Sequence, residues 1–346
     1  MIPGVVPGAS LLALLLASLL ATLASPSIWV LALAGFLVKG GIVLVLAPIV
    51  VVPSAVGLAN LVAPTLTSMV FGGISGEVLT TVVLIVVAIA SWLVLGGFAA
   101  AAVEVEGVRV IAQDEDVAGG AGLPREPTRS GTTMRVLLAR AIAAGPLVIA
   151  LASGSIRVVT VAYRELTVPS DVAAPLVLRV VRGAPEAIAW IVLAWILAEI
   201  VGALAARRIV LAGDGVTAAL GGTVRQIVRS PFRAVVAFVV PLGVLVGVLV
   251  PSAAASVASW DTIRAAIAND AGPAAVVTWI AIFVGLWVGG LVLVGMACAW
   301  RSAVWTLEAA RTFGGVSTGR PGEWTPAADT ATLADLRPHG ADPDPR

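Results

Sequence analysis

The chain has 346 residues, of which 59% are hydrophobic and 12% charged, with a mean hydropathy of +1.05 and a formal net charge of +1. Soluble proteins average roughly 45 to 50% apolar and about 25% charged residues, so this composition excludes a soluble globular domain. The small net charge, without basic clusters that alternate with aromatic residues, excludes nucleic-acid binding.

Six apolar stretches meet or approach the roughly 20 residues that a membrane-spanning helix needs. They cover residues 28–48, 78–103, 134–153, 185–206, 232–250 and 273–300. The sequence therefore predicts an all-α polytopic membrane protein, with a helical transmembrane domain over residues 1–312. The polar segment 313–346, rich in proline and glycine, is expected to be a disordered cytoplasmic tail.

The first apolar run, Ser10 to Ala24, is too short for a regular span. It resembles a signal peptide but has no basic residue before it, so we expect it to be retained. We predict that it lies in the membrane interface or dips into the bilayer, and whether it crosses stays open.

A faint internal repeat divides the chain into units of about 25–129, 130–229 and 230–312. Each odd-numbered span follows one of three dipeptides: Ser25-Pro26, Ser130-Gly131 and Ser230-Pro231. A serine cap followed by proline at the first helical position is typical of a helix start. Pro185 and Pro273 open the fourth and sixth spans in the same way. Two spans per unit make this a parallel repeat.

Arginines indicate the orientation. Arg109, Arg208 and Arg301 follow the even-numbered spans, whereas residues 42–81 contain no lysine or arginine. The positive-inside rule then places the even-span ends and both termini in the cytoplasm. The second outer loop disagrees, with four arginines at positions 157, 164, 179 and 182. Because Lys39 is the one lysine among 21 basic residues, the codon bias suggests a GC-rich bacterial genome and so a bacterial plasma membrane.

Several loops have helical periodicity. Asp214 is expected to cap an interfacial helix whose apolar side is formed by Val216, Leu220, Val224, Ile227 and Val228. Similar interfacial pieces are predicted over residues 257–267 and 171–181. The uncharged segment 54–76 is expected to stay in contact with lipid or with other helices.

Small residues recur at every fourth position of the even spans: Gly96 and Ala100; Ala194, Ala198, Gly202 and Ala206; and Ala281, Gly285 and Gly289. Such spacing lets helix backbones approach closely, so the even helices are expected to form the inner contacts. The alternative is that small residues are simply common in an alanine-rich chain.

Three ionisable residues lie well inside predicted spans: Lys39, Arg140 and Glu199. Arg140 and Glu199 lie roughly 9 and 12 Å from the cytoplasmic ends of their helices, at 1.5 Å per residue, so an ion pair between them is feasible. Lys39 lies nearer mid-membrane and reaches Glu199 only by extending toward the cytoplasm. The group is either a proton or substrate relay, or a packing pair that fixes helix register, which we favour.

Motifs for enzymes are absent: the chain contains no GxxxxGK[ST], HExxH, GxSxG or CxxC. A single histidine, His339 in the tail, and a single cysteine, Cys298 in an apolar span, argue against histidine-based metal or haem sites and exclude an internal disulfide. We therefore predict no catalytic, cofactor-binding or metal-binding residues.

The run AARRIVLAGDGVTAALGGTVRQIVRSPFRAVVAFVVP, within residues 203–251, resembles uncharacterised bacterial polytopic membrane proteins. These are similar to the membrane region of some glycerophosphodiester phosphodiesterases. The resemblance implies a helical membrane module linked to lipid or envelope metabolism. The soluble catalytic barrel of those enzymes has no counterpart in the chain, so no activity is implied.

Three functions stay open. The first is a non-catalytic membrane scaffold that contacts the lipid bilayer or other membrane subunits. The second is a transporter or permease subunit that uses the group of Lys39, Arg140 and Glu199, with Pro146 and Pro241 inside odd spans. The third, an enzyme acting on lipid within the membrane, depends on Glu199 alone.

Overall fold

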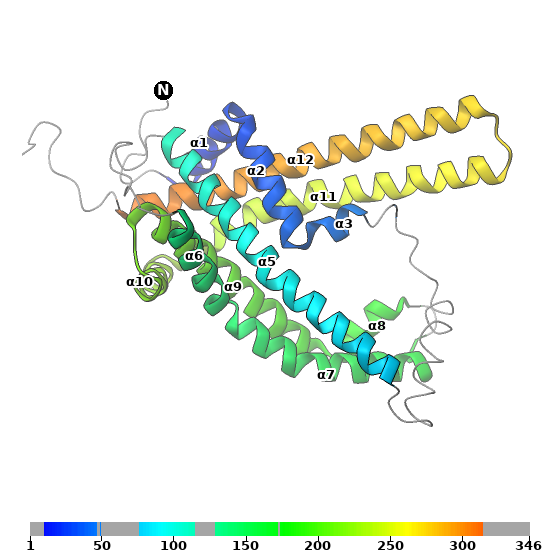
Figure 1. Cartoon of the computed structure of the whole chain (residues 1–346), viewed down its shortest axis with the longest axis horizontal. Coiled ribbons are helices and arrows are strands. Elements are labelled where there is room, and N and C mark those ends of the chain that lie inside the picture. Colours follow the sequence, from blue (N-terminus) through cyan, green and yellow to red (C-terminus); the bar gives the residue numbers. More distant parts are fainter. Residues whose placement is uncertain (1–9, 47–48, 50–75, 115–128, 172–173, 314–346) are drawn as a thin grey trace, which may run out of the picture.

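A computed structural model of the chain describes residues 10–46, 49, 76–114, 129–171 and 174–313 (Figure 1). Every regular element in these ranges is a helix. In the N-terminal part they are α1 (Leu11–Ala24), α2 (Pro26–Phe36), the π-helical turn η1 (Leu37–Gly41), α3 (Ile42–Leu46) and α5 (Gly76–Asp114). There follow α6 (Arg129–Ala143), α7 (Gly145–Thr167), α8 (Leu176–Gly183), α9 (Pro185–Ala212), α10 (Val216–Arg229), α11 (Pro231–Ala268) and α12 (Pro273–Phe313).

The predicted all-α polytopic architecture is confirmed. The described residues contain six helical stretches long and apolar enough to cross a membrane: Pro26–Leu46, Val78–Gln113, Gly131–Thr167, Pro185–Ala212, Pro231–Ala268 and Pro273–Ala310. Most are longer than predicted. At 1.5 Å per residue, a 38-residue helix is roughly 57 Å long, nearly twice the hydrocarbon core. These helices therefore tilt or extend beyond the bilayer.

Four described helices begin at a proline, but serine does not cap them. Helices α2, α9, α11 and α12 each begin at a proline. Pro146, predicted inside the third span, is instead the second residue of α7, which begins at Gly145 after α6 ends at Ala143. The side chains of Ser25 and Ser230 make no capping hydrogen bond, and the Ser230 hydroxyl donates instead to the carbonyl of Gln226 (3.1 Å). Ser130 lies inside α6 and not before it. The three-unit repeat accordingly stays a prediction.

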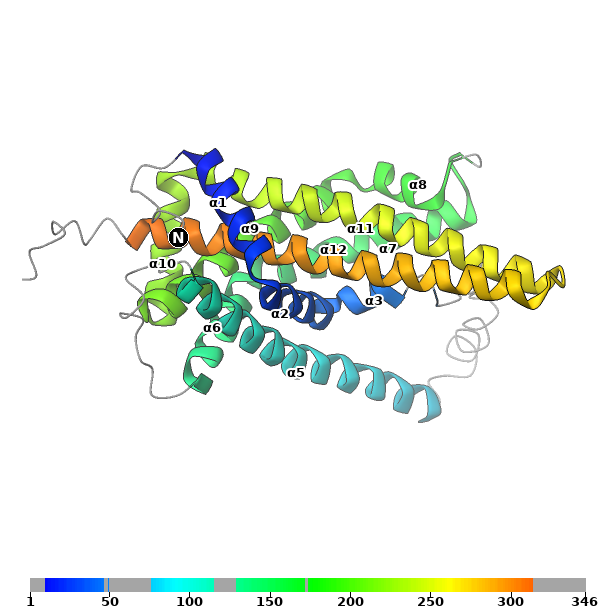
Figure 2. The ribbon, with the colours of Figure 1, turned by 90° about the horizontal axis from the view of Figure 1, so that it is seen from above.

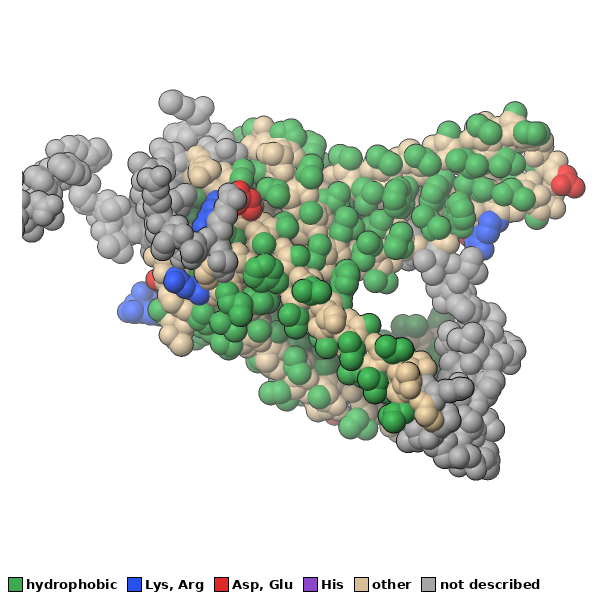
Figure 3. Space-filling model, in the orientation of Figure 1, with side chains coloured by type: hydrophobic (Ala, Val, Ile, Leu, Met, Phe, Trp, Pro, Cys, Tyr) green, Lys and Arg blue, Asp and Glu red, His purple; other side chains and the backbone are tan. Residues whose placement is uncertain are grey.

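The helices gather at one end of the molecule and spread apart at the other (Figures 1 and 2). Helices α5, α9 and α12 all end at the left of Figure 1, the converging end, where α1 and the start of α2 also lie. The largest hydrophobic core is here, with Phe238, Val304 and Trp305 almost fully buried. At the opposite, splayed end, the α11–α12 hairpin diverges from α5 and α7, and the space-filling view is hollowed between α5 and the hairpin (Figure 3).

Helix α1 is part of this core. Its Ser10 hydroxyl accepts from the amide of Ala13 (3.2 Å), which caps the helix, and Leu14 and Ser18 are buried. The indole Nε1 of Trp300 on α12 donates to the hydroxyl of Ser18 (3.0 Å). A short apolar run therefore becomes a fixed helix because it buries one face against α12.

The predicted interfacial pieces are only partly correct. Gly215, and not Asp214, occupies the N-cap of α10, because the Asp214 carboxylate accepts from Arg208 (3.0 Å). On the predicted apolar side, three residues pack on the core, while Val224 and Val228 are 52% and 74% exposed.

Two other pieces have different bounds from those expected. Residues 257–267 form no separate helix, since α11 continues through Pro251. The piece expected from Asp171 begins only at Leu176, as α8. The uncharged stretch 54–75 lies outside the described residues.

The prediction that small residues at every fourth position form close helix contacts is correct for α9 and wrong for α12. On α9, Ala206 is fully buried, and a Cβ added at Gly202 would lie 3.4 Å from Nη1 of Arg140. On α12, Gly285 and Gly289 face open space. The close contact is instead at Gly295, where an added Cβ would lie 3.1 Å from the carbonyl oxygen of Trp29 on α2.

Candidate functional site

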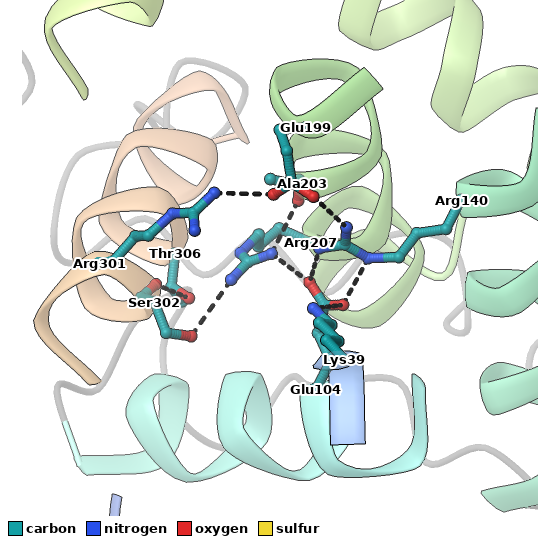
Figure 4. Close-up of polar contacts among 9 residues, drawn as sticks. All are labelled: Lys39, Glu104, Arg140, Glu199, Ala203, Arg207, Arg301, Ser302 and Thr306. Atoms are coloured by element: carbon teal, nitrogen blue, oxygen red, sulfur yellow. Dashed lines mark hydrogen bonds and ion pairs between the residues drawn. The ribbon is translucent and has the colours of Figure 1, made fainter. Parts of the chain in front are cut away.

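Six charged side chains meet where the helices converge, and they come from five segments of the chain (Figure 4). They are Lys39 on η1, Glu104 on α5, Arg140 on α6, Glu199 and Arg207 on α9, and Arg301 on α12. We call this set the ionic network. It ties together helices that are far apart in sequence.

Glu104 lies at the centre of the ionic network. Arg140 binds this carboxylate through two parallel hydrogen bonds, from Nε to Oε2 and from Nη2 to Oε1, both 2.6 Å long. Arg207 Nη1 donates to the same Oε1 (2.5 Å), and Lys39 Nζ lies 3.6 Å from Oε2. Glu104 therefore pairs with cations from three other segments, one of them in the two-pronged geometry that is strongest for arginine and carboxylate.

Glu199 forms a second, more open contact. Arg301 Nη2 donates to its Oε2 (2.7 Å), while Arg140 Nη1 lies 3.9 Å from its Oε1. The Arg301 guanidinium also lies over the ring of Phe238, 5.8 Å from the ring centre. Arg140 thus bridges the two carboxylates, and Arg301 anchors α12 to α9.

The network is unequally buried and carries more basic than acidic groups. The side chains of Glu104 and Arg207 are 7% and 4% exposed, whereas that of Lys39 is 42% exposed. Arg207 also donates to the hydroxyl of Ser302 (3.1 Å) and the carbonyl of Ala203 (3.0 Å), but its buried Nε has no hydrogen-bond partner among the described residues. With four basic groups and two carboxylates, its formal charge is +2.

The backbone around Lys39 explains how this residue reaches Glu104. Gly40 has φ of 106° and ψ of −4°, a conformation that other residues adopt only with strain. This residue and the π-helical turn break the helix that begins at Pro26, a known cause of kinks in helices. The kink places Lys39 beside α5.

The three predicted residues do come together, but with different partners from those expected. The predicted Arg140–Glu199 pair exists only as the longer contact of 3.9 Å, because Arg140 is held mainly by Glu104. The ammonium group of Lys39 forms an ion pair with Glu104. Among the described residues, the ion pairs of Glu199 are with Arg140 and Arg301 and not with Lys39. Glu104 and Arg207 were not among the predicted residues, and Arg301 was predicted only to follow the sixth span.

A signal for Glu104 exists in the sequence. The apolar run of the second span stops at Val103, yet α5 continues to Asp114. Ala101, Val108 and Ile111, at helical spacing from Glu104, are all buried. Apolar residues at i−3, i+4 and i+7 therefore mark the face of α5 on which Glu104 lies.

Other polar contacts lie outside the ionic network. Arg208 pairs with Asp214 (3.0 Å), and Arg233 with Glu308 (3.3 Å). At the splayed end, Glu165 is buried and accepts from the amide and hydroxyl of Ser170 at 2.9 and 2.7 Å. These contacts hold helix ends in place, whereas the ionic network joins five segments of the chain.

No family model, curated protein or solved structure matches the chain. The resemblance of residues 203–251 to bacterial polytopic membrane proteins therefore stays a prediction.

Proposed function

We propose that the protein is a non-catalytic scaffold of the bacterial plasma membrane whose spread helices contact lipid. The ionic network supports this, because it locks the helices together at the converging end. Every carboxylate in it is paired with arginine, an arrangement suited to fixing helices and not to proton transfer. At the splayed end, apolar helix surfaces lie open.

The first half of α5 is the observation that carries the proposal. Six consecutive residues, 82–87, are each between 46% and 63% exposed. Because successive residues of a helix point about 100° apart, six in a row cover every direction around the axis. All faces of this apolar segment therefore need hydrocarbon around them, which lipid supplies.

Photocross-linking tests whether lipid surrounds the first half of α5. We expect p-benzoylphenylalanine at Leu84, which is 63% exposed, to yield phospholipid adducts upon irradiation of native membranes, as measured by mass spectrometry. The same probe at Val108, which is fully buried, is the control and should give no lipid adduct. A single discrete protein adduct at Leu84 would contradict lipid contact there and point to a partner subunit.

The charge and exposure of the ionic network favour a second function, that of a transporter or permease subunit. The formal charge of +2 in the ionic network and the 42% exposure of Lys39 suit an anionic substrate. In proteoliposomes, this function requires a chloride or phosphate flux above that of protein-free vesicles, and the flux should fall in Lys39→Gln. Equal flux with and without protein argues against it.

A further inference from the structure

A groove of about 620 Å³ runs between α7 and α9, and none of the six residues of the ionic network lines it. Small residues make room for it. Ala150 and Gly154 on α7 face Ala187 and Ala194 on α9, with Pro146 and Leu197 at its inner end. The volume lies within the range of about 300 to 1,000 Å³ that is usual for sites of small molecules.

The helices touch closely beside the groove. A Cβ added at Gly154 would lie 3.0 Å from Cδ1 of Ile191 and 3.6 Å from the Cβ of Ala187. Larger side chains at these small residues would close the space. The small side chains on these two antiparallel helices thus leave the space that forms the groove.

The groove has opposite charges at its outer end. Arg157 on α7 and Glu186 on α9 both line it, both are exposed, and neither has an ion-pair partner among the described residues. Since Gly154 lies against Ala187, one helical turn further along α7 brings Arg157 near the level of Glu186. The rest of the lining is almost entirely apolar, with Trp190 and the hydroxyl of Ser153 among it.

Its length matches one leaflet of a bilayer. Pro146 and Arg157 are eleven residues apart, as are Glu186 and Leu197, which corresponds to roughly 16 Å along each helix. Half of the hydrocarbon core is about 15 Å thick. An acyl chain that starts at the charged end would therefore reach the inner end at mid-membrane.

We infer that this groove holds one acyl chain of a zwitterionic phospholipid, with its phosphate at Arg157 and its ammonium group at Glu186. The inference rests on the proposed lipid contact and names the lipid class and the site. A guanidinium binds a phosphate through charge-assisted hydrogen bonds, and a carboxylate accepts them from an ammonium group. An anionic headgroup without an amine would leave Glu186 unpaired and repelled.

Native mass spectrometry tests the site on protein from nanodiscs of equal parts phosphatidylethanolamine and phosphatidylglycerol. We expect one phosphatidylethanolamine to be retained preferentially. Its affinity should fall roughly tenfold in Arg157→Gln and in Glu186→Gln, as expected for a lost hydrogen bond to a charged group. Arg182→Gln, an exposed arginine on α8 outside the groove, is the matched control and should bind as wild type.

A blocking variant tests the apolar part. Ser153→Trp fills the groove, and Ser155→Trp places the same side chain on the same helix outside it. Both positions are exposed, so both variants should fold, as checked by size-exclusion profile and Tm. Ser153→Trp alone should lose the retained lipid.

Other outcomes overturn the inference. Equal retention in the two tryptophan variants excludes the groove as the site. Preferential retention of phosphatidylglycerol excludes the headgroup assignment, and a retained polypeptide excludes lipid as the occupant. If Leu84 still gives phospholipid adducts in any of these cases, the proposed lipid contact stands and only the groove assignment fails.

Discussion

Glu104 holds the ionic network together, because its carboxylate pairs with cations from three other segments of the described chain. Replacing it with glutamine raises the formal charge of the ionic network further above +2, at a site where the carboxylate is only 7% exposed. Removing one partner of a buried pair costs about 3 to 5 kcal/mol. We therefore expect Glu104→Gln to lower the Tm of the detergent-solubilised protein strongly.

Glu199→Gln is the matched comparison. Its carboxylate is 27% exposed and has one close partner, Arg301, so the expected loss is about 1 kcal/mol or somewhat more. Thermal unfolding followed by size exclusion measures both variants. If Glu104→Gln loses as much stability as Glu199→Gln or less, Glu104 is not the centre of the ionic network.

The sequence predicts charged residues in the membrane only where they interrupt an apolar run. Lys39, Arg140 and Glu199 do so and are found from hydropathy alone. Glu104 and Arg207 lie where the apolar run fades, so they resemble the start of a loop. Their burial depends on which helices converge around them, and local hydropathy contains no information on that.

At the scale of elements, the close contact between α2 and α12 depends on Gly295. Gly295→Val places a branched side chain against the backbone of Trp29 and should destabilise the protein by about 1 to 3 kcal/mol, as overpacking does. Gly289→Val, on the same helix with open space beside it, should leave the Tm nearly unchanged. Similar losses in both variants would show that helix propensity, and not the contact, decides the effect.

Gly289 and Gly295 show the limit of predicting helix contacts from the spacing of small residues. Spacing of four residues identifies a face on α12, but it does not say which face meets a partner. The sequence located all six spans, because apolar length is a local property. It ended α11 too early, since a proline such as Pro251 stops most soluble helices yet is tolerated in membrane helices.

At the scale of the whole molecule, the arginines bear on the orientation of the chain in the membrane, which stays a prediction. Two of the four arginines that disagreed, Arg164 and Arg179, lie 3.6 Å from the carboxylate of Glu165. The positive-inside rule counts lysines and arginines and is not a net-charge rule, so all four arginines still count against this orientation. The predicted topology places the converging end, where α5, α9 and α12 finish, on the cytoplasmic side, because Arg109, Arg208 and Arg301 follow the even spans (Figure 1).

Labelling of single cysteines in a Cys298→Ala background tests this topology. Arg229→Cys lies at the end of α10, near the converging end, and Asp270→Cys lies at the tip of the α11–α12 hairpin; both positions are exposed. A membrane-impermeant maleimide added to intact cells should label Asp270→Cys at once and Arg229→Cys only after the membrane is permeabilised. Immediate labelling of Arg229→Cys, or protection of Asp270→Cys in intact cells, would reverse the orientation. With the orientation reversed, Arg157 and Glu186 would select lipids of the cytoplasmic leaflet.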